Sequence, residues 1–246
     1  MRLSNKIAIV SGGGSGFGSG IVRKFAKEGA KVIVADIQIE NAKKVAHAAG
    51  GVAVEVDVSN SLSFKNLVST TLEKFGKIDI MVNNAGITHA PKKMEDISEE
   101  EFDRIFSVNS KSVFLCAKYL VPLMTSNGGG NILNIASTAG ISPRPNLSWY
   151  NATKGWMISA TKAMAIELAS KKIRVNALAP VAGETPLLKS FMGGDTPEKR
   201  EKFLSTIPIG RFSTPDDMGN AACFLCSEEA SMITGVILEV DGGRCI

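Results

Sequence analysis

A tyrosine and a lysine four residues apart, Tyr150 and Lys154, open a segment with helical character that runs to about Ala169. Residues four apart share a helix face, so the phenol and the ammonium should project toward the same region. A tyrosine with a pKa of about 10 is a poor base at neutral pH. Lowering that pKa by roughly three units corresponds to about 4 kcal/mol, which one cation at ~4 Å can supply in an effective dielectric near 20. The pair is a candidate acid–base catalyst; the alternative is two surface side chains on one helix face.

The composition is that of an ordinary globular protein. Hydrophobic residues make up 44% of the 246 residues and charged residues 21%, and the net charge of +4 arises from both signs scattered along the chain. A chain of this length can form a single domain, 1–246, and no basic run indicates a nucleic-acid partner. The apolar run after Lys6 ends after four residues, so neither a signal peptide nor a membrane span is predicted. We expect a cytoplasmic protein.

The cysteines do not have the spacing of a secreted disulfide framework, which fits a reducing compartment. The four are Cys116, Cys223, Cys226 and Cys245. Cys223 and Cys226 form a C-x-x-C in an apolar segment, but no second Cys/His pair accompanies them. We therefore expect them to pack inside a helix, and we predict no metal site.

A glycine-rich loop at 11–18 follows the first predicted strand and precedes a helical pattern from Ile21 to Lys27. Glycines let backbone amides and a helix N-terminus approach a phosphate closely, so the loop is predicted to bind a phosphorylated ligand. A Walker loop is excluded, because no Lys-Ser/Thr pair follows. The spacing Gly12-x-x-x-Gly16-x-Gly18 also differs from G-x-G-x-x-G, and a plain turn is the alternative.

Asp36 ends the second predicted strand. An acid at this point can accept hydrogen bonds from the adenosine ribose hydroxyls and repel a 2′-phosphate, which favours NAD over NADP. No cation that could bind such a phosphate stands at Ser15, Ile37 or Gln38. The alternative role for Asp36 is a helix N-cap, and both roles are compatible.

Short apolar runs alternate with helical segments along the whole chain. The predicted strands are 6–10, 31–35, 52–56, 78–82, 131–135, 173–177 and 236–240. The predicted helices include 61–75 and a long one over 99–125 with a polar interruption at Asn109-Ser110. This alternation predicts an α/β Rossmann fold with a doubly wound, seven-stranded parallel sheet and helices on both faces.

Several motifs follow one another at characteristic spacings. They are the 11–18 loop, Asn83-Asn84-Ala85-Gly86, Asn109, Ser137, Tyr150-x-x-x-Lys154, and Asn176 with Pro180 and Thr185. In this order they resemble the classical short-chain dehydrogenase/reductase family over essentially the whole chain. The resemblance implies an NAD-dependent oxidoreductase that acts on CH–OH groups of small molecules and assembles as a homotetramer.

The resemblance implies catalytic roles for four residues. Tyr150 is the expected acid–base residue, and Ser137 is expected to orient the substrate oxygen. Lys154 is expected to lower the pKa of the phenol and to bind the nicotinamide ribose. Asn109 is expected to interrupt its helix and to hold a water of the proton relay. In the oxidative direction the phenolate would remove the alcohol proton while hydride passes to the nicotinamide, whose positive charge also favours phenolate.

The cofactor contacts implied by the resemblance divide by the parts of the dinucleotide. The pyrophosphate is expected at Gly12, Ser15, Gly16, Phe17 and Gly18. The adenosine is expected at Asp36, Ile37, Asp57, Val58, Asn84, Ala85 and Gly86. The nicotinamide side is expected at Tyr150, Lys154, Pro180, Gly183 and Thr185.

Two positions depart from the family pattern. Ser11 stands where threonine is usual and keeps the hydroxyl. Val181 stands where glycine usually follows the proline. A β-branched residue is stiff and needs negative φ, so the backbone of the nicotinamide-side loop is the part of the site most open to change.

The residues that determine substrate specificity are expected in the segments 138–149, 88–94 and 182–212. The last of these is expected to act as a mobile lid. Candidates for an apolar substrate pocket, with core packing as the alternative, are Met94, Trp149, Phe191 and Met192. Arg144, between two prolines, is a candidate for binding a substrate carboxylate, and a solvated arginine is the alternative.

The leading interpretation is an NAD-dependent dehydrogenase of secondary alcohols that are cyclic, sugar-like or hydroxyacyl molecules. A 3-oxoacyl-acyl-carrier-protein reductase is the closest alternative. Asp36 argues against the NADPH of that subgroup, and few basic residues near the site could dock an acidic carrier. A non-catalytic dinucleotide-binding protein is the third reading, and the intact set of four catalytic residues argues against it. The helices after Glu99 and Tyr150 are expected to pack against other subunits, with the 245–246 tail near an interface.

Overall fold

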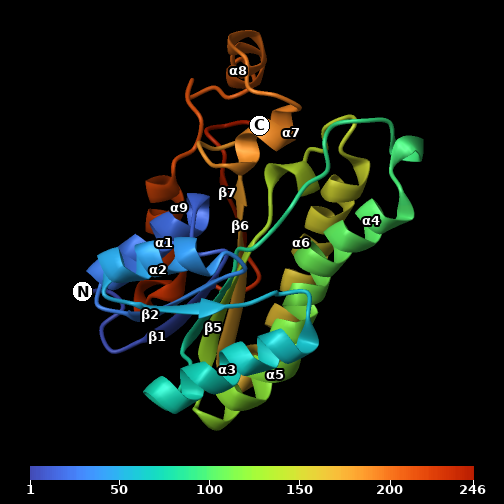
Figure 1. Ribbon diagram of the computed structural model, residues 1–246. Coiled ribbons are helices and arrows are strands. Elements are labelled where there is room, and N and C mark those ends of the chain that lie inside the picture. Colours follow the sequence, from blue (N-terminus) through green and yellow to red (C-terminus); the bar gives the residue numbers. More distant parts are fainter.

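Seven parallel strands form one sheet in the computed structural model, which describes residues 1–246 (Figure 1). In chain order they are β1 (Ile7–Ser11), β2 (Lys31–Asp36), β3 (Val52–Glu55), β4 (Ile80–Asn83), β5 (Gly130–Ile135), β6 (Ile173–Pro180) and β7 (Ile237–Val240). Their spatial order is β3-β2-β1-β4-β5-β6-β7, with every neighbouring pair parallel. The order reverses between β1 and β4, and ligands of such sheets bind at the carboxyl ends beside this point. The predicted Rossmann sheet is confirmed.

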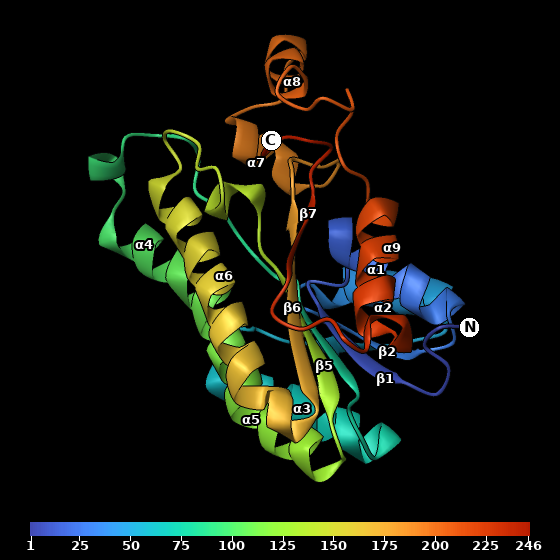
Figure 2. The ribbon, with the colours of Figure 1, turned by 180° about the vertical axis from the view of Figure 1, so that it is seen from behind.

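Helices cover both faces of the sheet. They are α1 (Gly16–Lys27), α2 (Ile39–Ala49), α3 (Ser61–Phe75), α4 (Glu99–Phe106), α5 (Ser112–Ser126), α6 (Ser148–Leu168), α7 (Leu187–Met192), α8 (Pro197–Leu204) and α9 (Pro215–Cys226). Figures 1 and 2 show α1, α2 and α9 on one face and α3, α5 and α6 on the other. The short helices α7 and α8 stand beyond the carboxyl ends of the strands. None of the helices combines the length and apolar character needed to cross a membrane.

The two hydrophobic cores follow from the alternation of side chains along buried strands. In β1, Ala8 and Val10 point into the core under α1 and α9, where Phe25 is fully buried. Ile9 points the other way, into the core under α3, α5 and α6 that contains Phe64. Because both faces are covered, the strands are apolar at nearly every position, as parallel strands usually are.

The predicted break in the long helix is present and has a defined geometry. Helix α4 begins with a capping box in which Ser98 and Glu101 satisfy each other's backbone amides. The helix then widens into a π-helical turn over Ser107–Lys111 before α5 begins. Such turns often mark functional sites, because the extra residue redirects side chains. Here the turn carries Asn109.

Boundaries differ from the predictions mostly by one or two residues, but three helices were not predicted. Helix α2 buries only the alanines Ala42 and Ala46, so its apolar periodicity is weak. Helices α7 and α8 lie in the segment 182–212 that was expected as a lid loop. Cys223 and Cys226 are buried in α9, as predicted, and all four cysteines are free.

Candidate active site

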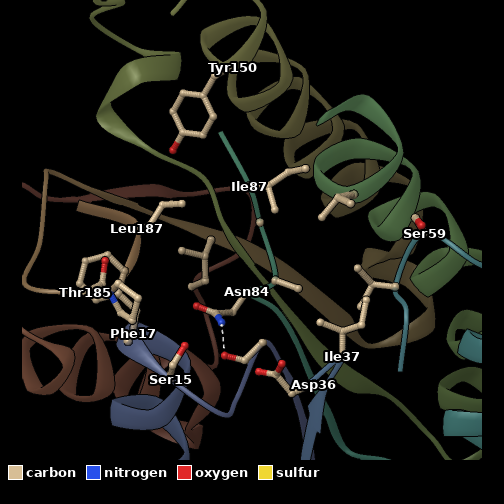
Figure 3. Close-up of a pocket in the computed structure, with 18 of the residues that line it drawn as sticks. Ser15, Phe17, Asp36, Ile37, Ser59, Asn84, Ile87, Tyr150, Thr185 and Leu187 are labelled. Atoms are coloured by element: carbon tan, nitrogen blue, oxygen red, sulfur yellow. Dashed lines mark hydrogen bonds between the residues drawn. The ribbon is translucent and has the colours of Figure 1, made fainter. Parts of the chain in front are cut away.

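The carboxyl ends of the strands surround a cavity of about 630 Å³ lined by 25 residues. A smaller pocket of about 60 Å³ adjoins it, and the two share Phe17, Tyr150, Pro180, Thr185 and Leu187. Predicted site residues that line the large cavity are Gly12, Ser15, Gly16, Phe17, Asp36, Ile37, Asp57, Val58, Asn84, Ala85, Gly86, Tyr150, Lys154, Pro180 and Thr185. Figure 3 shows Asp36 and Tyr150 toward opposite ends of this lining. The cavity is therefore elongated, as a dinucleotide requires.

The glycine loop joins β1 to α1 and leaves the start of the helix open. Gly12 has a φ of +62°, which other residues rarely adopt. Ser15, the N-cap of α1, makes no side-chain hydrogen bond to the first turn, so backbone amides there face the cavity. Gly18 lies outside the cavity lining, contrary to its predicted cofactor contact. A Cβ at Gly18 would lie 2.1 Å from the carbonyl oxygen of Gly12, so this glycine lets α1 pack against the loop.

Asp36 holds the glycine loop as well as lining the cavity. Its Oδ2 accepts a hydrogen bond of 2.9 Å from the Gly14 amide, and its Oδ1 accepts one of 2.9 Å from the Gln38 amide. It is not the N-cap of α2, because that position belongs to Gln38. Each carboxylate oxygen keeps acceptor capacity toward the cavity. The geometry fits a ligand with hydroxyl groups at this end.

Ser11 organises the loop that follows β4. Its hydroxyl accepts hydrogen bonds from the amides of Asn84 (3.0 Å) and Ala85 (3.1 Å) and donates one to the carbonyl of Val82. The side chain of Asn84 in turn donates to the carbonyls of Ser11 (2.7 Å) and Gly12 (3.1 Å), the second of which is drawn in Figure 3. Serine in place of threonine therefore keeps every hydrogen bond that this position needs.

Tyr150 and Lys154 lie in the first two turns of α6 and are almost fully buried. The Lys154 ammonium donates a hydrogen bond of 2.8 Å to the Ile135 carbonyl and lies 5.8 Å from the centroid of the Tyr150 ring. Ser137 follows β5 and lines the small pocket beside Tyr150. Its hydroxyl accepts a hydrogen bond of 3.1 Å from the Ala139 amide, and it lowers the pKa of the neighbouring phenol slightly. The three groups thus meet where the two pockets join.

Burial dominates the ionisation of both groups on α6. It raises the pKa of Tyr150 to about 12, and the neighbouring Ser137 hydroxyl only partly opposes this rise. Burial also lowers the pKa of Lys154 to about 8. We expected Lys154 to lower the pKa of the phenol, but desolvation outweighs that effect in the chain alone. The ammonium is directed at the Ile135 carbonyl rather than at the phenol oxygen, which accounts for its weak influence on the pKa of Tyr150.

Asn109 lies behind the cavity lining and holds the backbone of one lining residue in place through hydrogen bonds. Its Oδ1 accepts a hydrogen bond from the Ile87 amide, and its Nδ2 donates one to the Ile87 carbonyl, both 2.9 Å long. The same Nδ2 donates to the hydroxyl of Thr153, 3.1 Å away on α6. The side chain is fully buried, and Ile87 lines the cavity. Sequence reasoning did not predict this clamp.

Val181 fits its place because the backbone there has no positive φ that would require glycine. It follows β6, its amide points to the Val240 carbonyl, and its side chain is buried with Leu188 and Phe212. Gly183, two residues on, lines the small pocket but not the large cavity. A Cβ there would lie 2.2 Å from the Phe17 ring. The close contact between the glycine loop and the 182–212 segment therefore depends on Gly183.

The four residues suggested for an apolar pocket separate in the structure. Phe191 lines the small pocket and packs edge-on against Tyr150, with ring centroids 5.6 Å apart. Met192 packs in the cluster with Val181 instead. The indole of Trp149 donates to the Met94 carbonyl at 3.2 Å, and the Met94 side chain is exposed. Neither Trp149 nor Met94 lines the large cavity or the small pocket.

Further lining residues were not predicted: Val56, Ser59, Ile87, Arg104, Ser107, Val108, Ile135, Ala136, Pro186 and Leu187. Most of them stand within two positions of a predicted residue, so the strand-end rule could have found them. The strand-end rule does not cover Arg104, Ser107 and Val108, although the last two stand within two positions of Asn109. They belong to the α4 end and the π-helical turn, whose approach to the sheet depends on tertiary packing.

A family model described as enoyl-(acyl carrier protein) reductase matches residues 12–244. A 4-formylbenzenesulfonate dehydrogenase from Comamonas testosteroni is 46% identical over 252 residues, which cover 100% of both chains. The chain belongs to the short-chain dehydrogenase/reductase family.

Solved short-chain dehydrogenases/reductases agree with this assignment. A 3-ketoacyl-(acyl-carrier-protein) reductase from Brucella melitensis, complexed with NADH, is 52% identical and covers 99% of this chain and 100% of its own, with a TM-score of 0.95. A 7α-hydroxysteroid dehydrogenase complexed with NADH and 7-oxoglycochenodeoxycholic acid is 39% identical and covers 98% and 95%, with a TM-score of 0.92. The present short-chain dehydrogenase/reductase is an oxidoreductase of CH–OH groups that uses NAD(H).

Proposed function

We propose that this oxidoreductase interconverts secondary alcohols and ketones on small cyclic, sugar-like or hydroxyacyl molecules, with Tyr150 as the proton-transfer residue. The observation that carries the proposal is the meeting of Tyr150, Ser137 and Lys154 where the two pockets join. The small pocket beside Phe191 would take the carbon skeleton of the substrate. The large cavity would take the dinucleotide.

The residues of the large cavity fit NAD(H) by their chemistry. The open N-terminus of α1 would hold the pyrophosphate, and Asp36 would accept hydrogen bonds from the adenosine ribose. The only cationic side chains in the lining are Lys154, beside Tyr150, and Arg104 of α4, and neither forms an ion pair with Asp36. Lys154 and Thr185 would face the nicotinamide end. When bound, NAD(H) supplies or accepts the hydride.

The chain's own residues would handle the proton. In oxidation the Tyr150 phenolate takes the proton of the substrate hydroxyl, and in reduction the phenol returns it to the substrate oxygen. The Ser137 hydroxyl donates a hydrogen bond to that oxygen and fixes its distance from the phenol. Burial alone raises the pKa of Tyr150 to about 12, so the phenolate needs a positive charge beside it. The Lys154 ammonium is the only cationic side chain in the cavity lining next to the phenol.

The substitution Tyr150→Phe tests the proposal against a matched control. Tyr119 of α5 is the only other tyrosine, and its hydroxyl bonds to Ser61 at the start of α3, outside both pockets. We expect Tyr150→Phe to lower kcat by about 10²-fold or more while the Kd of NADH changes by less than about threefold. Tyr119→Phe should leave kcat unchanged. Full turnover by the Tyr150→Phe enzyme would overturn the assignment.

A second candidate function is the reduction of 3-oxoacyl thioesters. The 52% identity to a 3-ketoacyl-(acyl-carrier-protein) reductase favours it, and that relative was solved with NADH rather than NADPH. Comparing kcat/KM for an acetoacetyl thioester with kcat/KM for cyclic ketones, each with NADH and NADPH, separates the two. A thioester preference, or a strong preference for NADPH, would reverse our ranking.

We further propose a homotetramer of single-domain subunits in the cytoplasm. Exposed apolar side chains on α5 and α6, namely Phe114, Trp156 and Ile166, support an interface on these helices. Four free cysteines support a reducing compartment. The segment 182–212, which carries α7 and α8, would act as the lid over the substrate. A stable monomer in light scattering would contradict the assembly.

A further inference from the structure

Two arginines from distant parts of the chain meet beside the lid. Arg144 lies in the loop between Ser137 and α6, and its Nη2 donates to the Thr206 hydroxyl at 3.3 Å. Arg244 follows β7, and its Nη1 donates to the hydroxyl of Ser142 at 3.4 Å, two residues before Arg144. Three segments thus converge here: the loop after the catalytic serine, the end of the lid, and the segment after the last strand.

Neither guanidinium has an anionic partner. Arg200 pairs with Asp195 and Glu184, and Arg211 pairs with Asp217, but no carboxylate lies within ion-pair distance of Arg144 or Arg244. The Nε of Arg244 is buried and has no hydrogen-bond acceptor. Burial, and then the charge of Arg244, lower the pKa of Arg144 to about 10. Two partly buried like charges with a free donor are stabilised by an oxyanion that joins them.

A row of aromatic rings connects this pair to the catalytic phenol. The Phe191 ring stands edge-on to Tyr150 at 5.6 Å, and Phe203 of α8 stands edge-on to Phe191 at 5.9 Å. The Arg144 guanidinium lies 4.4 Å from the centroid of the Phe203 ring. A flat or apolar substrate that follows the row, with its carbonyl at Tyr150, would bring its far end to the arginines.

We propose that Arg144 and Arg244 form an anion-binding subsite for the distal end of the substrate. The substrate class is a ketone or alcohol on an aromatic or other apolar body that ends in a carboxylate or a similar oxyanion. Arginine suits this role because its planar fork matches a carboxylate with two parallel hydrogen bonds. The proposal rests on the proposed function, which places the carbonyl group of the substrate at Tyr150. Its test therefore compares the binding of charged ligands with that of their uncharged esters, which needs no turnover.

The test uses 4-acetylbenzoate and 4′-acetylbiphenyl-4-carboxylate, each beside its neutral methyl ester. We expect the enzyme to bind one of the acids at least about tenfold more tightly than its ester in the presence of NADH, by quenching of NADH fluorescence. Arg144→Met and Arg244→Met keep the apolar stem and remove the charge. Each substitution should bring the ratio of the affinities for acid and ester close to one, while the affinity for the ester changes by less than about threefold. Arg23→Met, which removes an exposed arginine of α1, should leave the ratio unchanged.

Equal binding of acids and esters by the unmodified enzyme would overturn the proposal, as would a preference for acids that survives both substitutions. A loss of rate confined to carrier-protein thioesters in the two variants would overturn it in favour of a docking role. The binding ratio does not depend on turnover, so it stays decisive if Tyr150→Phe refutes the proposed catalytic role. Binding of the ester also reports folding of each variant, and Arg144→Lys, which keeps charge but loses the fork, should retain an intermediate ratio.

Discussion

The side-chain amide of Asn109 donates a hydrogen bond to the hydroxyl of Thr153 across the junction of the π-helical turn and α6, over 3.1 Å. The same hydroxyl donates to the Tyr150 carbonyl at 2.8 Å. Thr153 therefore links the residue that clamps Ile87 to the residue that presents the phenol. Because Thr153 is fully buried, no water can replace either bond.

We predict that Thr153→Val lowers kcat about tenfold with little change in KM for NAD, because the phenol loses its fixed position but the adenosine end is untouched. The Asn109 N–H that loses its acceptor at Thr153, while the other still donates to Ile87, should also lower the free energy of unfolding by about 1 kcal/mol. Steady-state kinetics and urea unfolding measure the two effects. Thr153→Ser, which keeps the hydroxyl, should restore kcat. If Val and Ser variants have equal kcat, the hydroxyl has no positioning role.

The charge of Asp36 should decide between the two nicotinamide dinucleotides. We predict that Asp36→Asn reduces the preference for NAD over NADP by about tenfold or more, since it removes the repulsion of a 2′-phosphate while an amide oxygen can still accept the hydrogen bond from Gly14. The ratio of kcat/KM values for the two cofactors is the measurement. Asp57→Asn, at the adenine end of the same cavity, is the matched control. An unchanged ratio in Asp36→Asn would show that selection lies elsewhere.

Buried Lys154 should make the stability of the ligand-free protein rise with pH. Its pKa falls from 10.5 to about 8 on folding, so between these values the unfolded chain binds more protons than the folded chain. The free energy of unfolding should therefore rise by roughly 2 to 3 kcal/mol across this window, relative to Lys154→Met. Urea unfolding at pH 7.5 and 9.5 tests the difference. Lys118→Met, at an exposed site on α5, should follow the unmodified protein. If the free energies of unfolding of the unmodified protein and of Lys154→Met change equally with pH, the buried charge is refuted.

The sequence identified those parts of the fold and site that depend on local signals. Alternating apolar runs located all seven strands, and polar residues at strand ends located Asp36 and Asn84 in the cavity. What it missed depends on contacts between distant segments. The clamp of Asn109 on Ile87 requires a π-helical turn to meet the loop after β4. The need for glycine at 183 arises from the ring of Phe17, 166 positions earlier, and no local pattern reports such a contact.

The predicted lowering of the Tyr150 pKa by Lys154 did not appear in the chain alone for a similar reason. Helix spacing correctly put the two side chains on one face. It could not report that both are buried, or that the ammonium is drawn to the Ile135 carbonyl. Desolvation depends on everything packed around a group, so it has no signature in residue spacing.

The order of the strands divides the cavity between two halves of the chain. Lining residues around Asp36 and Val58, including Val108, which packs in the same cluster as Val58, precede position 110. Ser137, Tyr150 and the segment with α7 and α8 come later. Changes in the second half can therefore reshape the choice of substrate while the dinucleotide pocket keeps its form. This separation makes the scaffold evolvable, because substitutions in the later part of the chain can alter the substrate pocket without touching the glycine loop or Asp36.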